Sequence, residues 1–299
     1  MNKEKLFQEL SIILAERLHL LSDKPEESID STLKSLWLVS AGMCKSVEEA
    51  VKYPLPELTQ QQIIVLRGLI EQRISNIPLS YIIGRQSFMG IEMLSDKRAL
   101  IPRKETEILG RKALALTINI AQEKSFVKVL DICCGAGNLG LALASYNSKV
   151  VVSATDLSEY AINLTLDNIE YLNLSNRISA YTGDLFSAFE TEEYYDKIDV
   201  IVCNPPYISS AKVLKMDTEI SENEPALAFD GGMLGTKIIL RLISEAPKFL
   251  TIGGWLIFEI GVGQGQFIKQ LCERSESYTQ VESVLDDFGN IRVILAQKY

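Results

Sequence analysis

Apolar and polar residues follow two different patterns along the chain. Up to about residue 84, apolar residues recur every three or four positions, which is the period of a helix that buries one face. The first of these faces consists of Leu6, Leu10, Ile13, Leu14 and Leu18. Further helices are predicted over residues 31–41, 47–52 and 59–74, with Pro25, Gly42, Pro54 and Pro56 between them. We therefore predict a small N-terminal helical domain, residues 1–84, that either only packs or grips a macromolecular substrate.

From Arg85 the pattern changes to short β-like runs. Residues 85–93 and 98–101 predict two strands, joined by a turn at residues 95–97. A helix running to about residue 122 follows. We expect a β-hairpin linker at residues 85–110, followed by a second domain at residues 111–299.

In this second domain apolar β-like runs alternate with helical ones. Strands are predicted at residues 127–132, 150–155, 178–181, 200–203, 255–260, 280–285 and 291–295. Helices are predicted at residues 139–145, 158–172, 236–250 and 265–274. The alternation predicts an α/β fold with a doubly wound, mostly parallel sheet of seven strands. The connection at residues 286–290 is too short for a parallel crossover, so the last strand should be antiparallel.

Composition excludes several kinds of chemistry. The 299 residues include 30 Lys+Arg, 39 Asp+Glu and a single histidine, His19, with a net charge of −9. One histidine excludes a metal site with several histidines, and no Cys-x-x-Cys is present, so no metal is expected. The acidic balance argues against general nucleic-acid binding. Because no apolar run reaches about 18 residues and no signal-peptide pattern opens the chain, we expect a cytoplasmic protein without a membrane segment.

A glycine-containing turn follows the first strand of the predicted sheet. Glycines at this place let the backbone approach a ligand closely and expose N–H groups at the start of the next helix. In open α/β sheets this is where ligands bind. The candidate cofactor-binding residues here are Asp131, Cys133, Cys134, Gly135, Ala136 and Gly137.

The next two strands end in further candidates. Asp156, followed by Leu157, ends the second strand, where a carboxylate can accept both hydroxyls of a ribose. The alternative is that Asp156 only caps the following helix. Asp184 after the third strand could accept from an adenine amino group, with Leu185 flanking the ring. Together these strand ends predict a nucleoside pocket.

The glycines alone do not identify the cofactor. Gly135, Gly137 and Gly140 also satisfy the Gly-x-Gly-x-x-Gly pattern of dinucleotide sites, with Asp156 at about the expected distance. A nicotinamide or flavin dinucleotide therefore stands as an alternative to S-adenosylmethionine. The motif after the fourth strand distinguishes between these cofactors.

That strand is followed by Asn204-Pro205-Pro206-Tyr207. The two prolines fix the backbone and carry no N–H. The Asn204 side-chain oxygen and the Pro205 carbonyl can then accept the two N–H bonds of a planar NH₂ group, and Tyr207 supplies a ring face for it. An amino-group acceptor site beside a nucleoside pocket favours S-adenosylmethionine over a dinucleotide.

With these residues the chain resembles the Asn-Pro-Pro-Tyr amino-group methyltransferases, and among them the release-factor glutamine methyltransferases. The resemblance covers nearly the whole chain. Its motifs are the segments 78–84, 101–107, 183–186, 204–208, 224–228, 231–232 and 258–261, together with Gln264. It implies a Rossmann-like class I methyltransferase sheet behind a helical substrate-recognition domain and a hairpin linker.

The resemblance also implies a function. Family members transfer a methyl group from S-adenosylmethionine to the glutamine side-chain amide in the Gly-Gly-Gln loop of peptide-chain release factors. Asn204, Pro205 and Tyr207 would be catalytic, Asn204 would also contact the cofactor, and residues 204–207 would bind the substrate. The expected partner is a release factor, and a monomer is expected.

Four residues depart from the family pattern: Lys104, Cys133, Asn138 and Leu234. Cys133 and Asn138 belong to the expected cofactor turn. The departures fit a divergent member of the family, but also a paralog that methylates a small amine or amide or uses S-adenosylmethionine otherwise. A catalytically silent binding module is a third alternative.

Overall fold

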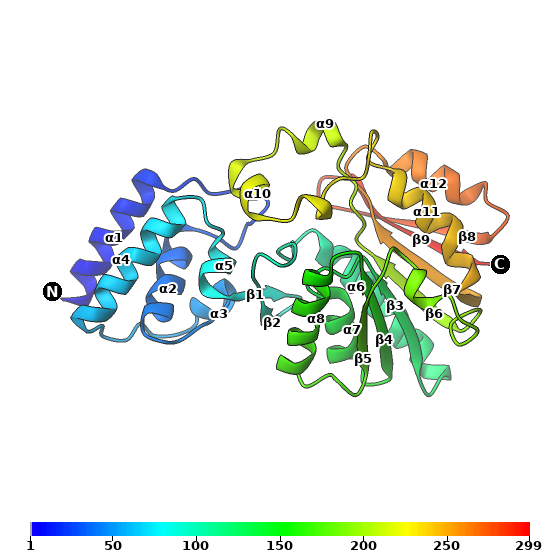
Figure 1. Cartoon of the computed structure of the whole chain (residues 1–299), viewed down its shortest axis with the longest axis horizontal. Helices are drawn as coiled ribbons and strands as arrows, with labels where there is room; N and C mark the ends of the chain where they lie inside the picture. Colours follow the sequence, from blue (N-terminus) through cyan, green and yellow to red (C-terminus); the bar gives the residue numbers. More distant parts are fainter. Residues whose placement is uncertain (1) are drawn as a thin grey trace. The chain divides into compact units, whose positions relative to one another are not determined.

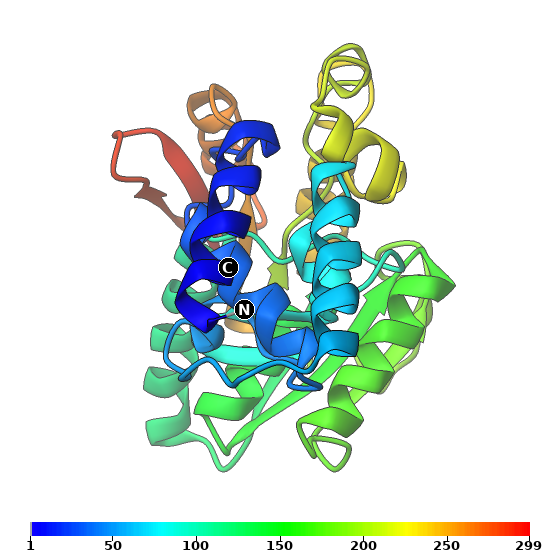
Figure 2. The same cartoon turned by 90° about the vertical axis from the view of Figure 1, so that its left-hand side faces the viewer.

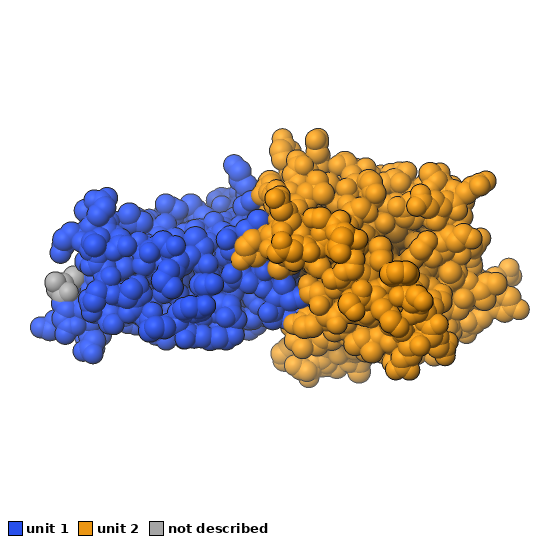
Figure 3. Space-filling view, turned by 90° about the horizontal axis from the view of Figure 1, so that it is seen from below, with its two compact units in different colours: residues 1–97, 101–104, 217–224 blue, residues 98–100, 105–216, 225–299 orange. Residues whose placement is uncertain are grey.

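The computed structural model describes residues 2–299 and places the chain in two units, shown in blue and orange in Figure 3. The helical unit consists of residues 1–97, 101–104 and 217–224. The sheet unit consists of residues 98–100, 105–216 and 225–299. The domain limits expected at residues 84 and 110 stay a prediction. Both strands of the hairpin belong to the helical unit.

Three helices, α1, α2 and α4, lie side by side in the helical unit and build its core (Figures 1 and 2). The apolar face predicted for α1 is confirmed, because Leu6, Leu10 and Leu14 are buried there against Trp37. Thr59 begins α4 by accepting a hydrogen bond from the Gln62 N–H, as helix-capping threonines do. The helices of this unit are α1 (Lys3–Arg17), α2 (Ile29–Ser40), α3 (Val47–Ala50), α4 (Gln60–Ile74), α5 (Leu79–Ile83) and α10 (Thr218–Asn223).

The hairpin is shorter than predicted. Strands β1 (Arg85–Phe88) and β2 (Ile91–Leu94) pair antiparallel, so the range expected for the first strand alone, residues 85–93, holds all of β1 and all of β2 except Leu94. Met89 and Gly90 connect them with φ angles of 52° and 82°, the left-handed pair that a two-residue hairpin turn requires. The strand expected at residues 98–101 was wrong, since these residues have no strand conformation.

The sheet unit contains the predicted seven-stranded sheet, in the order β5-β4-β3-β6-β7-β9-β8. Its first five strands in this order are parallel, while β9 is antiparallel to both of its neighbours. The expected antiparallel last strand and the α/β fold class are therefore confirmed. The strands are β3 (Val127–Ile132), β4 (Val150–Asp156), β5 (Ile178–Thr182), β6 (Ile198–Cys203), β7 (Leu250–Glu259), β8 (Tyr278–Leu285) and β9 (Ile291–Lys298).

Helices cover the sheet and complete its core (Figure 1). Apolar residues of α11 and α12 are buried in one cluster with Phe186, Phe249 and the inward residues of β3, β6 and β7. The α-helices of this unit are α6 (Thr106–Glu123), α7 (Asn138–Tyr146), α8 (Glu159–Tyr171), α9 (Ser210–Val213), α11 (Lys237–Glu245) and α12 (Gly265–Glu273). Short 3₁₀ turns are η1 (Ser187–Phe189), η2 (Ala226–Ala228) and η3 (Ala246–Lys248).

One predicted helix is too long. The helix expected over residues 236–250 ends at Glu245, after which η3 follows and β7 begins at Leu250. Pro247 lies inside η3, where its missing N–H cannot continue the α-helical hydrogen bonds. Within residues 2–299, no helix has the length and apolar content that crossing a membrane requires.

Candidate active site

The predicted site residues of the sheet unit lie along one edge of the sheet. Strands β5, β4, β3 and β6 are neighbours and parallel, so their carboxyl ends meet at the same edge. The residues singled out in the sequence follow these ends, at residues 131–137, 156–157, 184–185 and 204–207. The order of the strands in the sheet therefore brings four separate segments together, and this order cannot be read from the sequence. The role of each residue stays a prediction.

The turn after β3 has an unusual backbone. Cys133, Gly135 and Gly137 adopt φ angles of 58°, 57° and 82°, the left-handed region that favours glycine. A side chain at Gly137 would meet the Thr165 methyl group at 2.9 Å. Cys133 therefore adopts a conformation that a side chain disfavours. Asn138 begins helix α7 directly after the turn.

Asp131 at the end of β3 is a fully buried carboxylate. Its Oδ2 accepts a hydrogen bond from the Gly140 N–H at 2.8 Å, while Oδ1 has no hydrogen-bond partner among the described residues. Burial raises the pKa of Asp131 to about 7. A buried acceptor without a partner fits a site where a cationic or N–H group of a ligand completes the hydrogen bonding. Gly140 leaves the necessary space, since its Cβ would lie 3.1 Å from Asp131 Oδ2.

Asp156 connects two turns of this edge. Its Oδ2 accepts from the Gly135 N–H and its Oδ1 from the Ser158 N–H, both at 2.9 Å. Helix α8 is capped by Ser158, whose hydroxyl accepts from the Ala161 N–H, so the alternative that Asp156 is the helix cap was wrong. Burial raises the pKa of Asp156. Each carboxylate oxygen keeps a lone pair with which it could accept a ribose hydroxyl.

The segment after β5 is less enclosed. Arg241 Nη1 lies 2.9 Å from both carboxylate oxygens of Asp184, whose side chain is half-exposed. Leu185 is buried and has a φ of 51°, while Leu157 is exposed. The Asp184 carboxylate thus already pairs with an arginine. Its expected contact with an adenine amino group stays a prediction.

Asn204 follows β6 and is held by a residue of helix α6. Its Nδ2 donates a hydrogen bond to the buried Thr106 hydroxyl at 3.0 Å. This bond fixes the plane of the carboxamide and uses its donor end. The acceptor end, Oδ1, is therefore the end that remains to bind a substrate N–H.

Tyr207 is fixed by a buried ionic network. Its hydroxyl donates to Glu259 Oε1 at 2.9 Å, and Arg292 Nη2 lies 3.2 Å from the same oxygen. Burial raises the pKa of both Tyr207 and Glu259. The ring of Tyr207 is thus held at its far end by β7 and β9, and its orientation does not depend on a ligand.

Glycines and a glutamine enclose the backbone of the Asn-Pro-Pro-Tyr turn. A Cβ at Gly231 would lie 2.6 Å from the Pro206 carbonyl oxygen, and one at Gly235 would lie 2.1 Å from the Tyr207 carbonyl oxygen. Gln264 Nε2 donates to the same Tyr207 oxygen at 3.1 Å. The turn is therefore held at its backbone as well as by its side chains.

Four supporting residues were not identified as functional from the sequence. Thr106, Glu259 and Gln264 lie inside motifs of the resemblance, but nothing local indicates which partners they have. Arg292 was detectable as the one charged residue among residues 291–295. Among residues 2–299, no three His, Cys, Asp or Glu side chains form a group suited to a metal ion.

Comparison with known proteins gives the same family from most of the chain. Residues 110–234 match the methyltransferase small domain. The release factor glutamine methyltransferase of Rhodopirellula baltica is 32% identical over 262 residues, which cover 87% of each chain. The enzyme of that name from Caulobacter vibrioides is 32% identical over 276 residues, covering 92% of this chain and 90% of its own. The human methyltransferase 10 domain containing protein has a TM-score of 0.51 at 17% identity, covering 70% of this chain and 89% of its own, which shows the fold.

The sheet order, the glycine-containing turn after β3 and the turn after β6 define a class I methyltransferase that uses S-adenosylmethionine. The chain belongs to the release factor glutamine methyltransferase family. The expected fold class, enzyme class and cofactor are thereby confirmed, and the dinucleotide alternative was wrong.

Replacing Thr106 with valine tests how Asn204 is oriented. Valine keeps the volume but cannot accept the bond from Asn204 Nδ2, so the carboxamide can rotate. We expect turnover to fall about tenfold, with cofactor affinity unchanged. Thr106→Ser keeps the hydroxyl and should retain most activity. Equal turnover of the valine and serine variants would contradict this role.

Proposed function

We propose that the protein transfers a methyl group from S-adenosylmethionine to the side-chain amide nitrogen of a glutamine in the Gly-Gly-Gln loop of peptide-chain release factors. The observation that carries this proposal is the Asn204 carboxamide, whose donor end is held by Thr106. Its acceptor end is thereby kept for a substrate NH₂. The printed names of the relatives support the same acceptor.

The reaction exchanges one bond for another. When bound, S-adenosylmethionine supplies an electrophilic methyl group on a sulfonium. A bond forms between the glutamine nitrogen and the methyl carbon, the bond from that carbon to sulfur breaks, and S-adenosylhomocysteine leaves. The nitrogen then loses one proton to solvent. No histidine base is needed, because the proton becomes acidic once the nitrogen carries the methyl group.

The chain contributes position and electrostatic stabilisation. An amide nitrogen is a poor nucleophile since its lone pair is delocalised, so orientation supplies much of the acceleration. Asn204 Oδ1 and the Pro205 carbonyl accept the two N–H bonds and stabilise the positive charge that grows on nitrogen. Pro206 keeps the turn rigid, and the Tyr207 ring flanks the planar group.

The cofactor would be held along the sheet edge. The fit rests on the partnerless Asp131 Oδ1, suited to the ammonium of the methionine portion, and on Asp156, suited to the ribose hydroxyls. We assign the cofactor contacts to Asp131, Cys133, Cys134, Gly135, Ala136, Gly137, Asp156, Leu157, Asp184, Leu185 and Asn204.

The pKa of Asp131 makes cofactor binding depend on pH. Because that pKa is raised to about 7, the carboxyl holds a proton below this pH in the free protein. An ammonium group favours the carboxylate, so binding below about pH 7 releases a proton, and affinity should fall about tenfold for each further pH unit. Calorimetry in buffers of different ionisation enthalpy measures this release. Asp131→Asn should bind weakly without the pH dependence, whereas an equally steep profile in this variant would refute the assignment.

Labelled-methyl transfer to a purified release factor tests the proposed function. A matched release factor with alanine in place of the loop glutamine is the control. Label on the glutamine alone supports the proposal. Label only on small amines or amides would instead support the paralog, and cofactor binding without transfer would support the silent module.

The proposal also covers the partner, the oligomeric state, the location and the role of the helical unit. A release factor taken from solution, rather than nucleic acid, is the proposed partner, in keeping with the net charge of −9. We propose that the protein acts as a monomer in the cytoplasm, where translation factors are found. The helical unit is the proposed substrate-recognition part.

A further inference from the structure

The loop that follows the Asn-Pro-Pro-Tyr turn contributes a segment to the helical unit. We call residues 208–235 the acceptor loop. Within it, residues 217–224 belong to the helical unit, whereas residues 208–216 and 225–235 belong to the sheet unit. The chain therefore leaves the sheet unit after Met216 and returns at Pro225. Helix α10 (Thr218–Asn223) makes up most of the inserted segment.

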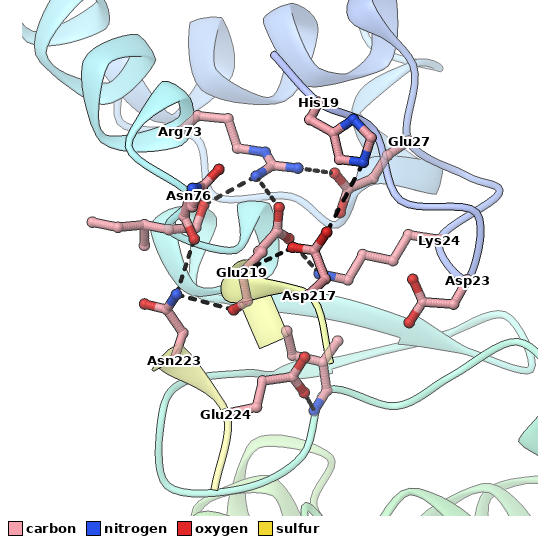
Figure 4. Close-up of polar contacts among 12 residues, drawn as sticks. His19, Asp23, Lys24, Glu27, Arg73, Asn76, Asp217, Glu219, Asn223 and Glu224 are labelled. Atoms are coloured by element: carbon pink, nitrogen blue, oxygen red, sulfur yellow. Dashed lines mark hydrogen bonds and ion pairs between the residues drawn. The ribbon is translucent and has the colours of Figure 1, made fainter. Parts of the chain in front are cut away.

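Glu219 of α10 is buried between two cations, Lys24 from the connection between α1 and α2 and Arg73 from α4. Lys24 Nζ lies 2.6 Å from Glu219 Oε1, and Arg73 Nη1 of α4 lies 2.7 Å from Glu219 Oε2 (Figure 4). These three side chains are at most 3% exposed. Both carboxylate oxygens of Glu219 are thus paired with a positive charge away from water.

A second carboxylate balances this cluster. Arg73 Nη2 lies 2.9 Å from Glu27 Oε2, so two cations face two carboxylates. Burial raises the pKa of Glu27 against the lowering effect of Arg73. Burying four charges is costly, and removing one partner leaves another charge buried without compensation. Such an arrangement is weak evidence for stability, but it fixes the place of α10 with high specificity.

Further polar contacts hold the C-terminal end of the inserted segment. Glu224 Oε2 accepts from the Ile101 N–H at 3.0 Å, and Glu224 Oε1 pairs with Arg103 Nη2 at 2.5 Å. Asn223 Nδ2 donates to the Asn76 carbonyl at 3.0 Å. The segment is therefore attached to the helical unit at Glu219 and at its C-terminal end.

The acceptor loop closes on itself beside Tyr207. The Ile208 N–H donates to the Phe229 carbonyl at 3.0 Å, and the Gly231 N–H donates to the Ile208 carbonyl at 2.8 Å. Both bonds involve Ile208, which follows Tyr207 directly. The second also involves Gly231, which packs closely against the Pro206 carbonyl. Residues 209–216 and 225–229 therefore connect α10 to hydrogen bonds that lie directly beside the Asn204–Tyr207 turn.

We propose that Glu219 is a positioning residue, which sets the acceptor loop, and with it the Asn204–Tyr207 turn, by attaching α10 to the helical unit. The proposal rests on the proposed function, since it assigns this turn to the methyl acceptor. A rival explanation is that the cluster only stabilises the helical unit. The two explanations predict different results for a correctly folded variant. Only the positioning role predicts a change in turnover per cofactor-binding site.

The kinetic test compares Glu219→Gln with Glu71→Gln. The first removes the charge that pairs with Lys24 and Arg73. The second removes a charge from Glu71, which lies on α4 as Arg73 does. Glu71 forms an exposed ion pair with Arg17 at 3.1 Å. For Glu219→Gln we expect kcat per cofactor-binding site on a release factor to fall about tenfold, because misplacing an acceptor costs rate rather than binding. KM and cofactor affinity should stay within about twofold, and Glu71→Gln should match the unmodified protein.

Hydrogen exchange gives a readout that needs no methyl transfer. In Glu219→Gln, amides of residues 208–216 and 225–230 should exchange at least about fivefold faster, together with those of α10. If Glu219→Gln does not fold, Asn223→Ala repeats both tests, since it removes the bond to Asn76 and leaves the charges paired. Its effects should be smaller and in the same direction.

The outcomes separate this inference from the proposed function. Faster exchange confined to residues of the helical unit, or an unchanged kcat per binding site, would overturn the positioning role. If the unmodified protein methylates no release factor, the proposed function fails. The exchange of residues 208–216 and 225–230 then still decides whether Glu219 positions the loop.

Discussion

Asn204→Ala is expected to lower methyl transfer about a thousandfold. The substitution removes the oxygen that, in the proposed function, both orients the glutamine amide and stabilises the charge growing on its nitrogen. Cofactor affinity should change little, because Asn204 is one of several assigned cofactor contacts and the others, among them the turn after β3 and Asp156, remain in place. Labelled-methyl transfer to a release factor and calorimetry with the cofactor measure the two quantities on the same preparation.

A matched control lies outside the Asn204–Tyr207 turn. Asn290 donates through Nδ2 to Asp286 in the turn between β8 and β9. Asn290→Ala removes a side chain of the same type from the same unit and should leave turnover unchanged. If Asn204→Ala retained the turnover of the unmodified protein, Asn204 would not be the acceptor of the substrate amide.

Gly235→Ala is expected to lower turnover by a factor on the order of 10². The new Cβ would lie 2.1 Å from the Tyr207 carbonyl oxygen, a distance that forces the turn or the glycine to move. The added methyl group would also lie 3.0 Å from Gln264 Nε2, which holds that oxygen. Turnover per cofactor-binding site measures displacement of the turn separately from loss of folded protein.

Gly289→Ala separates the close contact from backbone strain. Gly289 has a φ of 81°, similar to the 70° of Gly235, but nothing lies within 4 Å of its Cβ position. Both variants therefore carry the strain of a left-handed alanine, and only one meets the turn. Equal turnover in the two variants would show that the contact with Tyr207 does not matter.

Strands and helices of the sheet unit could largely be predicted from the sequence. Buried strands such as Val127–Ile132 are continuous apolar runs, and the short connection before Ile291 required an antiparallel last strand. The hairpin was predicted in the wrong place because the turn begins at Met89, which has a φ of 52°. Methionine rarely adopts this left-handed conformation, so the sequence does not indicate a turn there. Pairing within residues 85–94 decided its position.

The candidate site could be predicted only in part. Asp131, Asp156 and Asn204 were singled out because each lies at or directly after the end of an apolar strand, in a recognisable motif. Their partners could not be found in this way. The bond from Asn204 to Thr106 joins residues 98 positions apart, and no local pattern records it. Asp184 was expected to face adenine, yet its pairing with Arg241 depends on a helix that is distant in sequence.

The sequence by itself determined the alternation of strands and helices, the Asn-Pro-Pro-Tyr turn and the family, because these depend on local periodicity and on short motifs. Tertiary structure alone decided where the acceptor loop is held. Helix α10 has too few apolar residues to predict a buried element. Its Glu219 meets Lys24 and Arg73 across 195 and 146 residues. Charges separated so widely along the chain become partners only when folding removes them from water together, where each stabilises the other.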